Sequence, residues 1–200
     1  MNTSILYPFI LLSYLLGAIP FGYILTRYYT GKNILKIGSG NVGSTNVGRV
    51  AGKKIAIITQ LLDMLKGLLP VAVYLYFFDD NKIDTEFFVY CIALAAIIGH
   101  DFSIFLKFKG GKGVNTTLGA SVLLAPFSVF ISVAIYFIVK WRLKYVSLGS
   151  IILAISLTIT EFLIHGLSST FYYLFVCMTL IILLHRTNIK RLLNKEELSS

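Results

Sequence analysis

Charged residues are scarce in this chain: they make up only 14% of its 200 residues, and just nine are Asp or Glu. A water-soluble domain of this size carries about a quarter charged residues, so the composition excludes an ordinary soluble domain. Apolar residues reach 56%, with a mean hydropathy of +0.81. Cysteine is scarce too. Cys91 and Cys177 fall within apolar runs without metal-ligand spacing, so we predict inert membrane residues, no metal site and no cofactor.

Long apolar stretches indicate membrane-spanning helices. Residues 4–26 carry no charge, and a helix of about 20 apolar residues crosses the hydrocarbon core of a bilayer. This stretch lacks a basic start and carries its positive charges afterwards, which is typical of a spanning helix with its N-terminus outside rather than of a cleaved signal peptide. Further stretches with few charges follow at 55–78, 87–106, 147–164 and 170–184.

The net charge of +9 is distributed as in a membrane protein. Sixteen of the 18 Lys and Arg residues lie at 27–54, 107–113, 140–144 and 185–195, whereas residues 79–86 hold four of the nine acids. Basic segments stay in the cytoplasm, so we place those four segments inside and the acidic one outside. This placement argues against a nucleic-acid partner.

The number of predicted helical segments depends on whether residues 114–139 form one helix or two. As a single span they would leave seven positive charges on the outer side. A turn at Ala125-Pro126 removes the conflict, because proline disfavours helix at its own position and in the residue before it. We therefore predict an all-α polytopic integral membrane protein with seven helical segments, N-terminus out and C-terminus in. Two of them, about 114–124 and 127–140, would be too short to cross comfortably; a single tilted helix is the alternative.

No repeat of fixed period and no low-complexity linker is visible. We therefore predict one membrane-embedded domain over residues 1–200, with a disordered tail at 196–200.

The first of three polar segments spans residues 38–49. Glycine lets backbone N–H groups approach a ligand closely, and successive N–H groups form nests for anions; an arginine fork suits phosphate. A flexible connector is the alternative, but it has no need of two asparagines, three hydroxyls and an arginine in the eleven positions from 39 to 49. The candidate ligand-binding residues here are Gly38, Ser39, Gly40, Asn41, Thr45, Asn46 and Arg49.

The second polar segment, residues 107–117, leads into a predicted helix. Its resemblance to the phosphate loop of nucleotide hydrolases is superficial, because Gly113 follows Lys112 where that motif needs Ser or Thr. Glycine N–H groups and a lysine at a helix N-terminus nevertheless favour an anion. A positive-inside anchor would explain the lysines but not the clustered glycines. The candidate phosphate-binding residues are Gly110, Gly111, Lys112, Gly113 and Thr116.

The third polar segment follows the last apolar stretch. In a helix His185 and Asn188 lie one turn apart on one face and can meet a single substrate. The neighbouring cations suit lipid headgroups, so a basic membrane-surface tail is the alternative. The predicted topology favours a site, because it places His185 on the same side of the membrane as the other two segments.

Charges and histidines within the apolar stretches are a weaker signal. Asp63 and Lys66 are three residues apart and can pair on one helical face, either for function or as a structural pair. His100-Asp101 lies near the inner end of its stretch, where it is placed to orient the second segment. Glu161 and His165 fall at the predicted outer side.

These three segments, in this order, resemble the acyl-phosphate-dependent glycerol-3-phosphate acyltransferases of bacteria, the PlsY family, and the resemblance covers nearly the whole chain. Gly-Ala-Ile-Pro-Phe-Gly at 17–22 is similar to that family's first helix. The resemblance implies a multi-pass protein of the bacterial cytoplasmic (inner) membrane with its active site facing the cytoplasm. Its implied partners are acyl phosphate, glycerol 3-phosphate and membrane lipid. The positions that match the family's active site are Ser39, Arg49, Lys112, His185 and Asn188.

The chain departs from the family pattern at three positions. Ser103 and Asn115 stand where Pro and Ala are expected, which bears on loop rigidity. Lys195 stands where Gly usually precedes the final Glu, here Glu197, and this leaves the role of Glu197 open.

The resemblance implies that the sn-1 hydroxyl of glycerol 3-phosphate attacks the carbonyl of an acyl phosphate, giving lysophosphatidic acid and phosphate, the first step of phospholipid synthesis. His185 is then either the general base or only a group that orients the substrate. No covalent intermediate is expected, because a G-x-S-x-G elbow is absent. The rival hypotheses are a membrane transporter or binder of an organic phosphate, which predicts inverted repeats and a midplane site, and a non-catalytic assembly protein.

Overall fold

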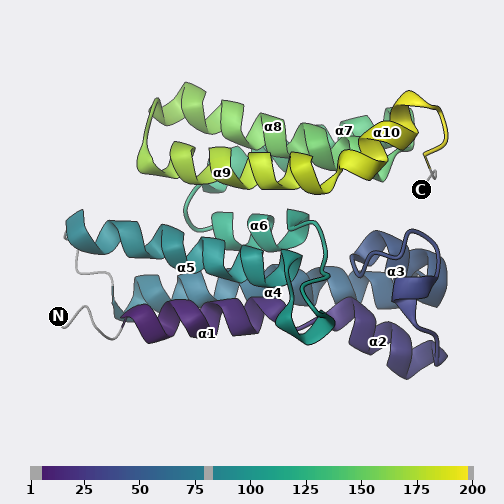
Figure 1. Ribbon diagram of the computed structural model, residues 1–200. Coiled ribbons are helices and arrows are strands. Elements are labelled where there is room, and N and C mark those ends of the chain that lie inside the picture. The colour runs from purple at the N-terminus through teal and green to yellow at the C-terminus, as the bar shows by residue number, and fades with distance from the viewer. Residues whose placement is uncertain (1–5, 79–82, 198–200) are drawn as a thin grey trace. The chain divides into compact units, whose positions relative to one another are not determined.

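The computed structural model describes residues 6–78 and 83–197, with the backbone alone at 83–86, and no strand occurs among them. The all-α prediction is therefore confirmed for this part of the chain (Figure 1). The acidic segment at 79–86 and the last three residues of the predicted tail at 196–200 lie outside the described side chains.

The chain divides into two compact units, residues 1–123 and 124–200, and the single domain over residues 1–200 stays a prediction. The first unit contains α1 (Leu6–Ala18), α2 (Phe21–Thr30), the 3₁₀ helix η2 (Ile34–Lys36), α3 (Ser44–Ala51), α4 (Lys53–Phe77), α5 (Ile83–Asp101), the 3₁₀ helix η3 (Ile104–Leu106) and α6 (Val114–Ser121). The second contains α7 (Pro126–Leu143), α8 (Val146–His165), α9 (Ser169–Leu184) and α10 (Arg186–Leu193).

Glycines set the closest helix contacts of the first unit, where α1 packs along α5 and α6 packs along α4. A Cβ at Gly17 would lie 2.0 Å from the carbonyl oxygen of Ala96, and one at Gly99 would lie 2.2 Å from that of Tyr14. In the α4–α6 contact, a Cβ at Gly119 would lie 1.9 Å from the carbonyl oxygen of Met64. Small residues allow such backbone approach between helices in a membrane.

The first predicted span, residues 4–26, is interrupted where α1 ends at Ala18 and α2 begins at Phe21. The physical reason is Pro20, which cannot donate a backbone hydrogen bond. Side chains from elsewhere satisfy the carbonyls left open by the break: Ser103 Oγ donates to Ala18 O over 2.5 Å, and Lys66 Nζ donates to Ile19 O over 3.1 Å.

Residues 114–139 form two helices, so the alternative of one tilted helix is wrong. α6 has eight residues and α7 has 18, with Pro126 in the first turn of α7, a position that proline favours. The expected boundaries were only approximate. The 18 residues of α7 extend about 27 Å, and the helix is long and apolar enough to be a candidate membrane span. α6 extends only about 12 Å.

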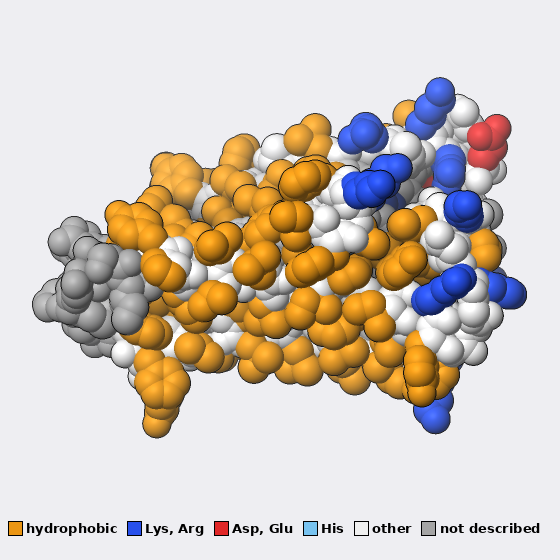
Figure 2. Space-filling model, turned by 60° about the horizontal axis from the view of Figure 1, so that its bottom comes forward, with side chains coloured by type: hydrophobic (Ala, Val, Ile, Leu, Met, Phe, Trp, Pro, Cys, Tyr) orange, Lys and Arg blue, Asp and Glu red, His pale blue; other side chains and the backbone are white. Residues whose placement is uncertain are grey.

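Five of the described helices or helix pairs are long and apolar enough to cross a membrane, and α9 with α10, bent by 58°, would make a sixth. Hydrophobic side chains cover much of the visible surface (Figure 2); Tyr76, Phe127 and Phe130, for example, are all more than 70% exposed. The five are Leu6–Thr30, Lys53–Phe77, Phe87–Leu106, Pro126–Leu143 and Val146–His165. Seven segments and their orientation stay a prediction.

In the second unit α8 packs between α7 and α9. Ser128 Oγ donates to Glu161 Oε2 over 2.6 Å, and His165 Nδ1 lies 3.0 Å from Glu161 Oε1. The buried carboxylate of Glu161 therefore has a partner on α7 and one at the end of its own helix.

Candidate active site

The first polar segment is a loop followed by a helix, α3, rather than a connector without structure. Asn46 organises it from within and is buried. Its Nδ2 donates to Ile37 O and to Asn41 O, both over 3.0 Å, and its Oδ1 accepts from the backbone N–H of Ser39 over 3.1 Å. Gly38 leaves room for this amide, because a Cβ there would lie 2.2 Å from Asn46 Oδ1.

The other candidates of this segment lie around that core. Ser39 and Asn41 are half-buried in the loop, and Ser39 Oγ lies 3.5 Å from the backbone N of Asn41, which donates to it. Thr45 and Arg49 are exposed on α3, where Arg49 belongs to the last turn. The backbone N–H groups of Ser39, Gly40, Asn41 and Gly43 all donate to nearby acceptors in the chain. The expected anion nest is therefore not seen at these four N–H groups, and the polar side chains of the loop surround a buried amide.

The second segment forms a turn that we call the glycine loop, residues 110–113. The backbone N–H of Gly111 donates to His100 O over 3.0 Å, which ties the loop to the end of α5. A Cβ at Gly113 would lie 3.0 Å from Asp101 Oδ2, and Gly113 has a φ of +71°. The preceding Lys107 and Phe108 also have left-handed φ values, of 55° and 60°, a conformation that non-glycine residues adopt at a cost of about 1–3 kcal/mol each.

Two hydrogen bonds join the first segment to the second. Asn41 Nδ2 donates to Gly110 O, and Asn115 Nδ2 donates to Ser44 Oγ, each over 3.3 Å. The structure therefore brings these two segments together within the first unit, as a shared phosphate site requires.

The remaining candidates of the second segment differ in exposure. Lys112 is half-buried beside the glycines. Thr116 is fully buried in α6, where a Cβ at Gly67 of α4 would lie 2.2 Å from its carbonyl oxygen. The structure thus places Thr116 in the α4–α6 contact.

The third segment lies in the second unit, at the junction of α9 and α10. His185 is buried there, and its Nδ1 lies 2.8 Å from Ile181 O. Because a carbonyl only accepts, Nδ1 carries the proton, and the lone pair of a neutral ring is on Nε2. Asn188 is buried as well and donates from Nδ2 to Glu197 Oε1 over 2.7 Å. Glu197 thus holds the Asn188 amide, which answers the question raised by the departure at Lys195.

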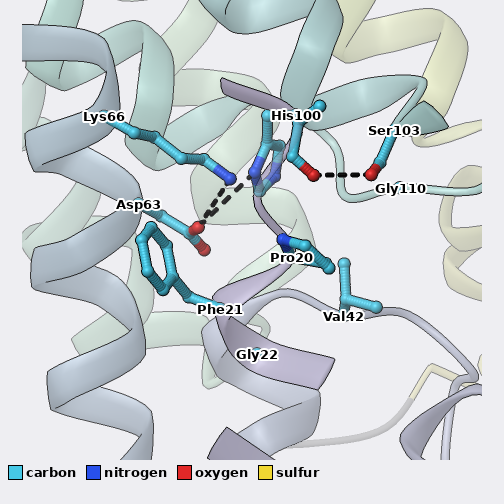
Figure 3. Close-up of a pocket in the computed structure, with 10 residues that line it drawn as sticks. Pro20, Phe21, Gly22, Val42, Asp63, Lys66, His100, Ser103 and Gly110 are labelled. Atoms are coloured by element: carbon cyan, nitrogen blue, oxygen red, sulfur yellow. Dashed lines mark hydrogen bonds and ion pairs between the residues drawn. The ribbon is translucent and has the colours of Figure 1, made fainter. Parts of the chain in front are cut away.

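A pocket beside the glycine loop contains Gly110, His100, Asp63 and Lys66, which were singled out from the sequence, together with residues to which sequence reasoning gave no site role. Its lining is Ala18, Pro20, Phe21, Gly22, Val42, Asp63, Lys66, His100, Ser103 and Gly110 (Figure 3). The predicted Asp63–Lys66 pair is confirmed, with 2.9 Å between Lys66 Nζ and Asp63 Oδ1. The polar groups of the pocket contact one another and the neighbouring backbone: His100 Nδ1 lies 3.6 Å from Asp63 Oδ1, and Ser103 donates to Ala18 O. Pro20 within an otherwise apolar stretch was the sequence signal for it.

No group of three or more His, Cys, Asp or Glu residues suited to a metal ion occurs in the described part of the chain. The lysine and glycine N–H groups of the glycine loop are donors that suit a phosphate directly.

Comparison with known proteins assigns the chain to a family. A family model described as Glycerol-3-phosphate acyltransferase matches residues 7–195. The glycerol-3-phosphate acyltransferase of Clostridium acetobutylicum is 42% identical over 190 residues, which cover 94% of this chain and 96% of that protein. Glycerol-3-phosphate acyltransferase 2 of Thermotoga maritima is 39% identical over 189 residues, covering 94% of this chain and 93% of that one.

Solved structures agree. The glycerol 3-phosphate form of PlsY (YgiH), an integral membrane glycerol 3-phosphate acyltransferase, matches with a TM-score of 0.90 and 34% identity, covering 98% of this chain and 95% of that one. Its lysophosphatidic acid form matches with a TM-score of 0.86 and 34% identity, covering 97% and 94%. The fold and sequence therefore define a polytopic integral membrane acyltransferase. The chain belongs to the glycerol-3-phosphate acyltransferase family of the PlsY type.

Proposed function

We propose that this protein transfers a fatty acyl group from acyl phosphate to the sn-1 hydroxyl of glycerol 3-phosphate. The observation that carries the proposal is the pair of hydrogen bonds that joins the first polar segment to the glycine loop. They hold together two segments that contribute Arg49 and Lys112, and both substrates carry a phosphate. The relatives named above support the acceptor, glycerol 3-phosphate.

The chemistry asks mainly for positioning. An acyl phosphate is a mixed anhydride and is already activated, so the protein needs to align the reactants and stabilise negative charge. The hydroxyl oxygen forms an ester bond with the carbonyl carbon while the bond from that carbon to the phosphate oxygen breaks. The products are 1-acylglycerol 3-phosphate and inorganic phosphate.

Roles follow from residue chemistry. Lys112 and the N–H groups of Gly110 and Gly113 bind the acyl phosphate, whereas Arg49 and Ser39 bind glycerol 3-phosphate or its reacting hydroxyl. The N–H of Gly111, expected among the phosphate donors, donates to His100 O instead. Gly38, Gly40, Asn41, Thr45 and Asn46 shape the first segment for this purpose. Asn188 orients the acceptor.

His185 acts on the acceptor hydroxyl in one of two ways. With the proton on Nδ1 directed to Ile181 O, the lone pair on Nε2 suits either a general base or a hydrogen-bond acceptor that orients the hydroxyl. In the second case an oxygen of the departing phosphate takes the proton. Turnover of the His185→Ala variant at saturating substrate separates them: near-normal turnover excludes the base.

We further propose that each of the three polar segments lies on the cytoplasmic side of a bacterial inner membrane. The distribution of Lys and Arg supports seven segments with the N-terminus out and the C-terminus in.

One assay tests the function. Purified protein is given glycerol 3-phosphate with either acyl phosphate or an acyl thioester, in buffer with a metal chelator, and release of inorganic phosphate and formation of lysophosphatidic acid are followed. We expect product from acyl phosphate alone. Product from the thioester alone overturns the donor assignment, and transport of an organic phosphate into vesicles without any acyl transfer would favour the rival class.

A further inference from the structure

Three ionisable side chains inside the first unit form a connected group that the proposed reaction does not use. Lys66 Nζ lies 2.9 Å from Asp63 Oδ1, and His100 Nδ1 lies 3.6 Å from the same oxygen. Their exposed fractions are 2% for Asp63, 2% for Lys66 and 6% for His100. Burying charged groups is unfavourable unless they are paired, so the arrangement calls for a role.

One end of this group holds the break between α1 and α2. Lys66 Nζ donates to Ile19 O and lies over the ring of Phe21, 5.8 Å from its centroid. Ser103, which follows α5, donates to Ala18 O at the same break. The break is therefore fixed by side chains from α4 and from the turn after α5 (Figure 3).

The other end reaches the glycine loop through His100. Its carbonyl oxygen accepts from the N–H of Gly111, and its ring lies against the α-carbon of that glycine, since a Cβ there would be 1.9 Å from Nε2. A Cβ at Gly110 would meet the same carbonyl oxygen at 2.1 Å. Backbone and ring of His100 together fix where the glycine loop begins.

We propose that His100 is a positioning residue for the glycine loop and that Asp63 and Lys66 act through it by holding its ring in place. The inference rests on the proposed function, in which the glycine loop holds a substrate phosphate. Asp63 accepts from Lys66 while it faces His100 Nδ1, so the ring is held by α4 rather than by its own helix. Asp63 and Lys66 thereby influence the position of the glycine loop, although His100 lies between them and that loop.

The central experiment is a double-mutant cycle of His100→Ala and Gly111→Ala, with KM and kcat measured for each substrate. His100→Ala is expected to lower kcat/KM on the order of 100-fold, as displacement of a binding group by about 1 Å does, mainly through the KM of the substrate that the glycine loop holds. Gly111→Ala is damaging alone because its Cβ meets the ring. Without the His100 ring the added methyl group has space. The fold-loss of kcat/KM in the double variant is therefore expected to be smaller than the product of the fold-losses in the two single variants.

A second pair of variants tests the charges. Replacing Asp63 alone leaves a buried lysine unpaired, whereas Asp63→Asn with Lys66→Met removes both charges together, a change that buried pairs often tolerate in stability. This double variant is expected to fold and to raise the same KM as His100→Ala. The matched control is Glu161→Gln, which neutralises an equally buried carboxylate in the second unit and is expected to leave both KM values unchanged.

The outcomes separate this inference from the proposed function. If wild type makes no product, the proposed function falls, and the positioning role is read from inorganic phosphate binding to wild type and His100→Ala. The positioning role of His100 is overturned if wild type binds no inorganic phosphate, or if wild type and His100→Ala bind it equally well. If wild type is active, the positioning role is overturned by either of two results. One is that the losses of His100→Ala and Gly111→Ala multiply in the double variant. The other is that Glu161→Gln raises KM as much as the Asp63→Asn, Lys66→Met variant does.

Discussion

Asn115 donates a hydrogen bond to the hydroxyl of Ser44 and so joins the first turn of α6 to the first turn of α3. Asn115 is one of the departures from the family pattern, in which alanine is expected. In this chain it supplies a link between the two phosphate-type segments that alanine cannot supply.

Asn115→Ala removes that link and is expected to lower kcat/KM roughly fivefold, the equivalent of about 1 kcal/mol for one hydrogen bond. Ser44→Ala is expected to match it, and the double variant to lose no more than either single one. Steady-state kinetics on the three proteins check this, with exposed Asn194→Ala as the control. Independent losses from the two single variants contradict the link.

Gly38 and Gly31 form a matched pair, because both have left-handed φ values, of 62° and 69°. A Cβ at Gly31 meets nothing within 4 Å, whereas one at Gly38 meets Asn46 Oδ1. Both alanine variants are expected to lose about 1 kcal/mol of stability from backbone strain. Only Gly38→Ala also displaces the Asn46 amide and raises the KM for glycerol 3-phosphate. Thermal unfolding measures the loss of stability, and steady-state kinetics measure the KM for glycerol 3-phosphate. Equal KM values in Gly38→Ala and Gly31→Ala would contradict the role of Gly38.

Glu197 holds Asn188 through a hydrogen bond to a charged acceptor. Glu197→Ala is expected to lower kcat/KM about 30-fold, since such a bond contributes about 2 kcal/mol. Glu197→Gln keeps an acceptor oxygen and is expected to retain most of the activity. The ratio of the two rates is the measurement, and an Ala variant as active as the Gln variant would contradict the role.

Lys195 has a φ of 59°, which explains why glycine is the expected residue at this position. Lys195→Gly is expected to raise the free energy of unfolding by about 0.5–1 kcal/mol, because it removes left-handed strain although it adds freedom to the unfolded chain. Lys195→Ala keeps the strain and serves as the control. Denaturation in the same detergent compares the variants, and equal stability of all three would reject the explanation.

The proposed topology is tested by single cysteines in a background without Cys91 and Cys177. With the N-terminus out, cysteines at Lys32 and Lys144 are expected to react with a membrane-impermeant maleimide only in inside-out vesicles, and one at Thr85 only in right-side-out vesicles. Positions 32 and 144 lie in basic segments, which stay in the cytoplasm, whereas position 85 lies in the acidic segment. Labelling of position 144 from outside would reject the seven-segment topology.

Features that depend on local sequence pattern or on the thickness of the bilayer could be predicted from the sequence. Apolar runs near 20 residues identified the long helices, and the spacing of Asp63 and Lys66 identified their ion pair. The combination of basic runs with Pro126 identified the interruption before α7. Each of these features is encoded within one helix or by its flanking charges.

Contacts between distant residues were beyond the sequence. Nothing local to Asn46 shows that its amide turns inward, and nothing near His100 shows that its ring lies against Gly111. The Asn46 contacts depend on how the loop before α3 folds back on that helix, and the His100 contact depends on how the chain returns to the end of α5. Residues 4–26 were expected to form one span, so neither the break at Pro20 nor its stabilisation by Ser103 was predicted from the sequence.

The close packing of α6 on α4 has a consequence for the glycine loop. A side chain at Gly67 or Gly119 would meet the backbone of the other helix, so neither helix can slide along the other without moving backbone atoms. Because the glycine loop leads directly into α6, this contact sets the depth along α4 of the loop that we propose to bind phosphate.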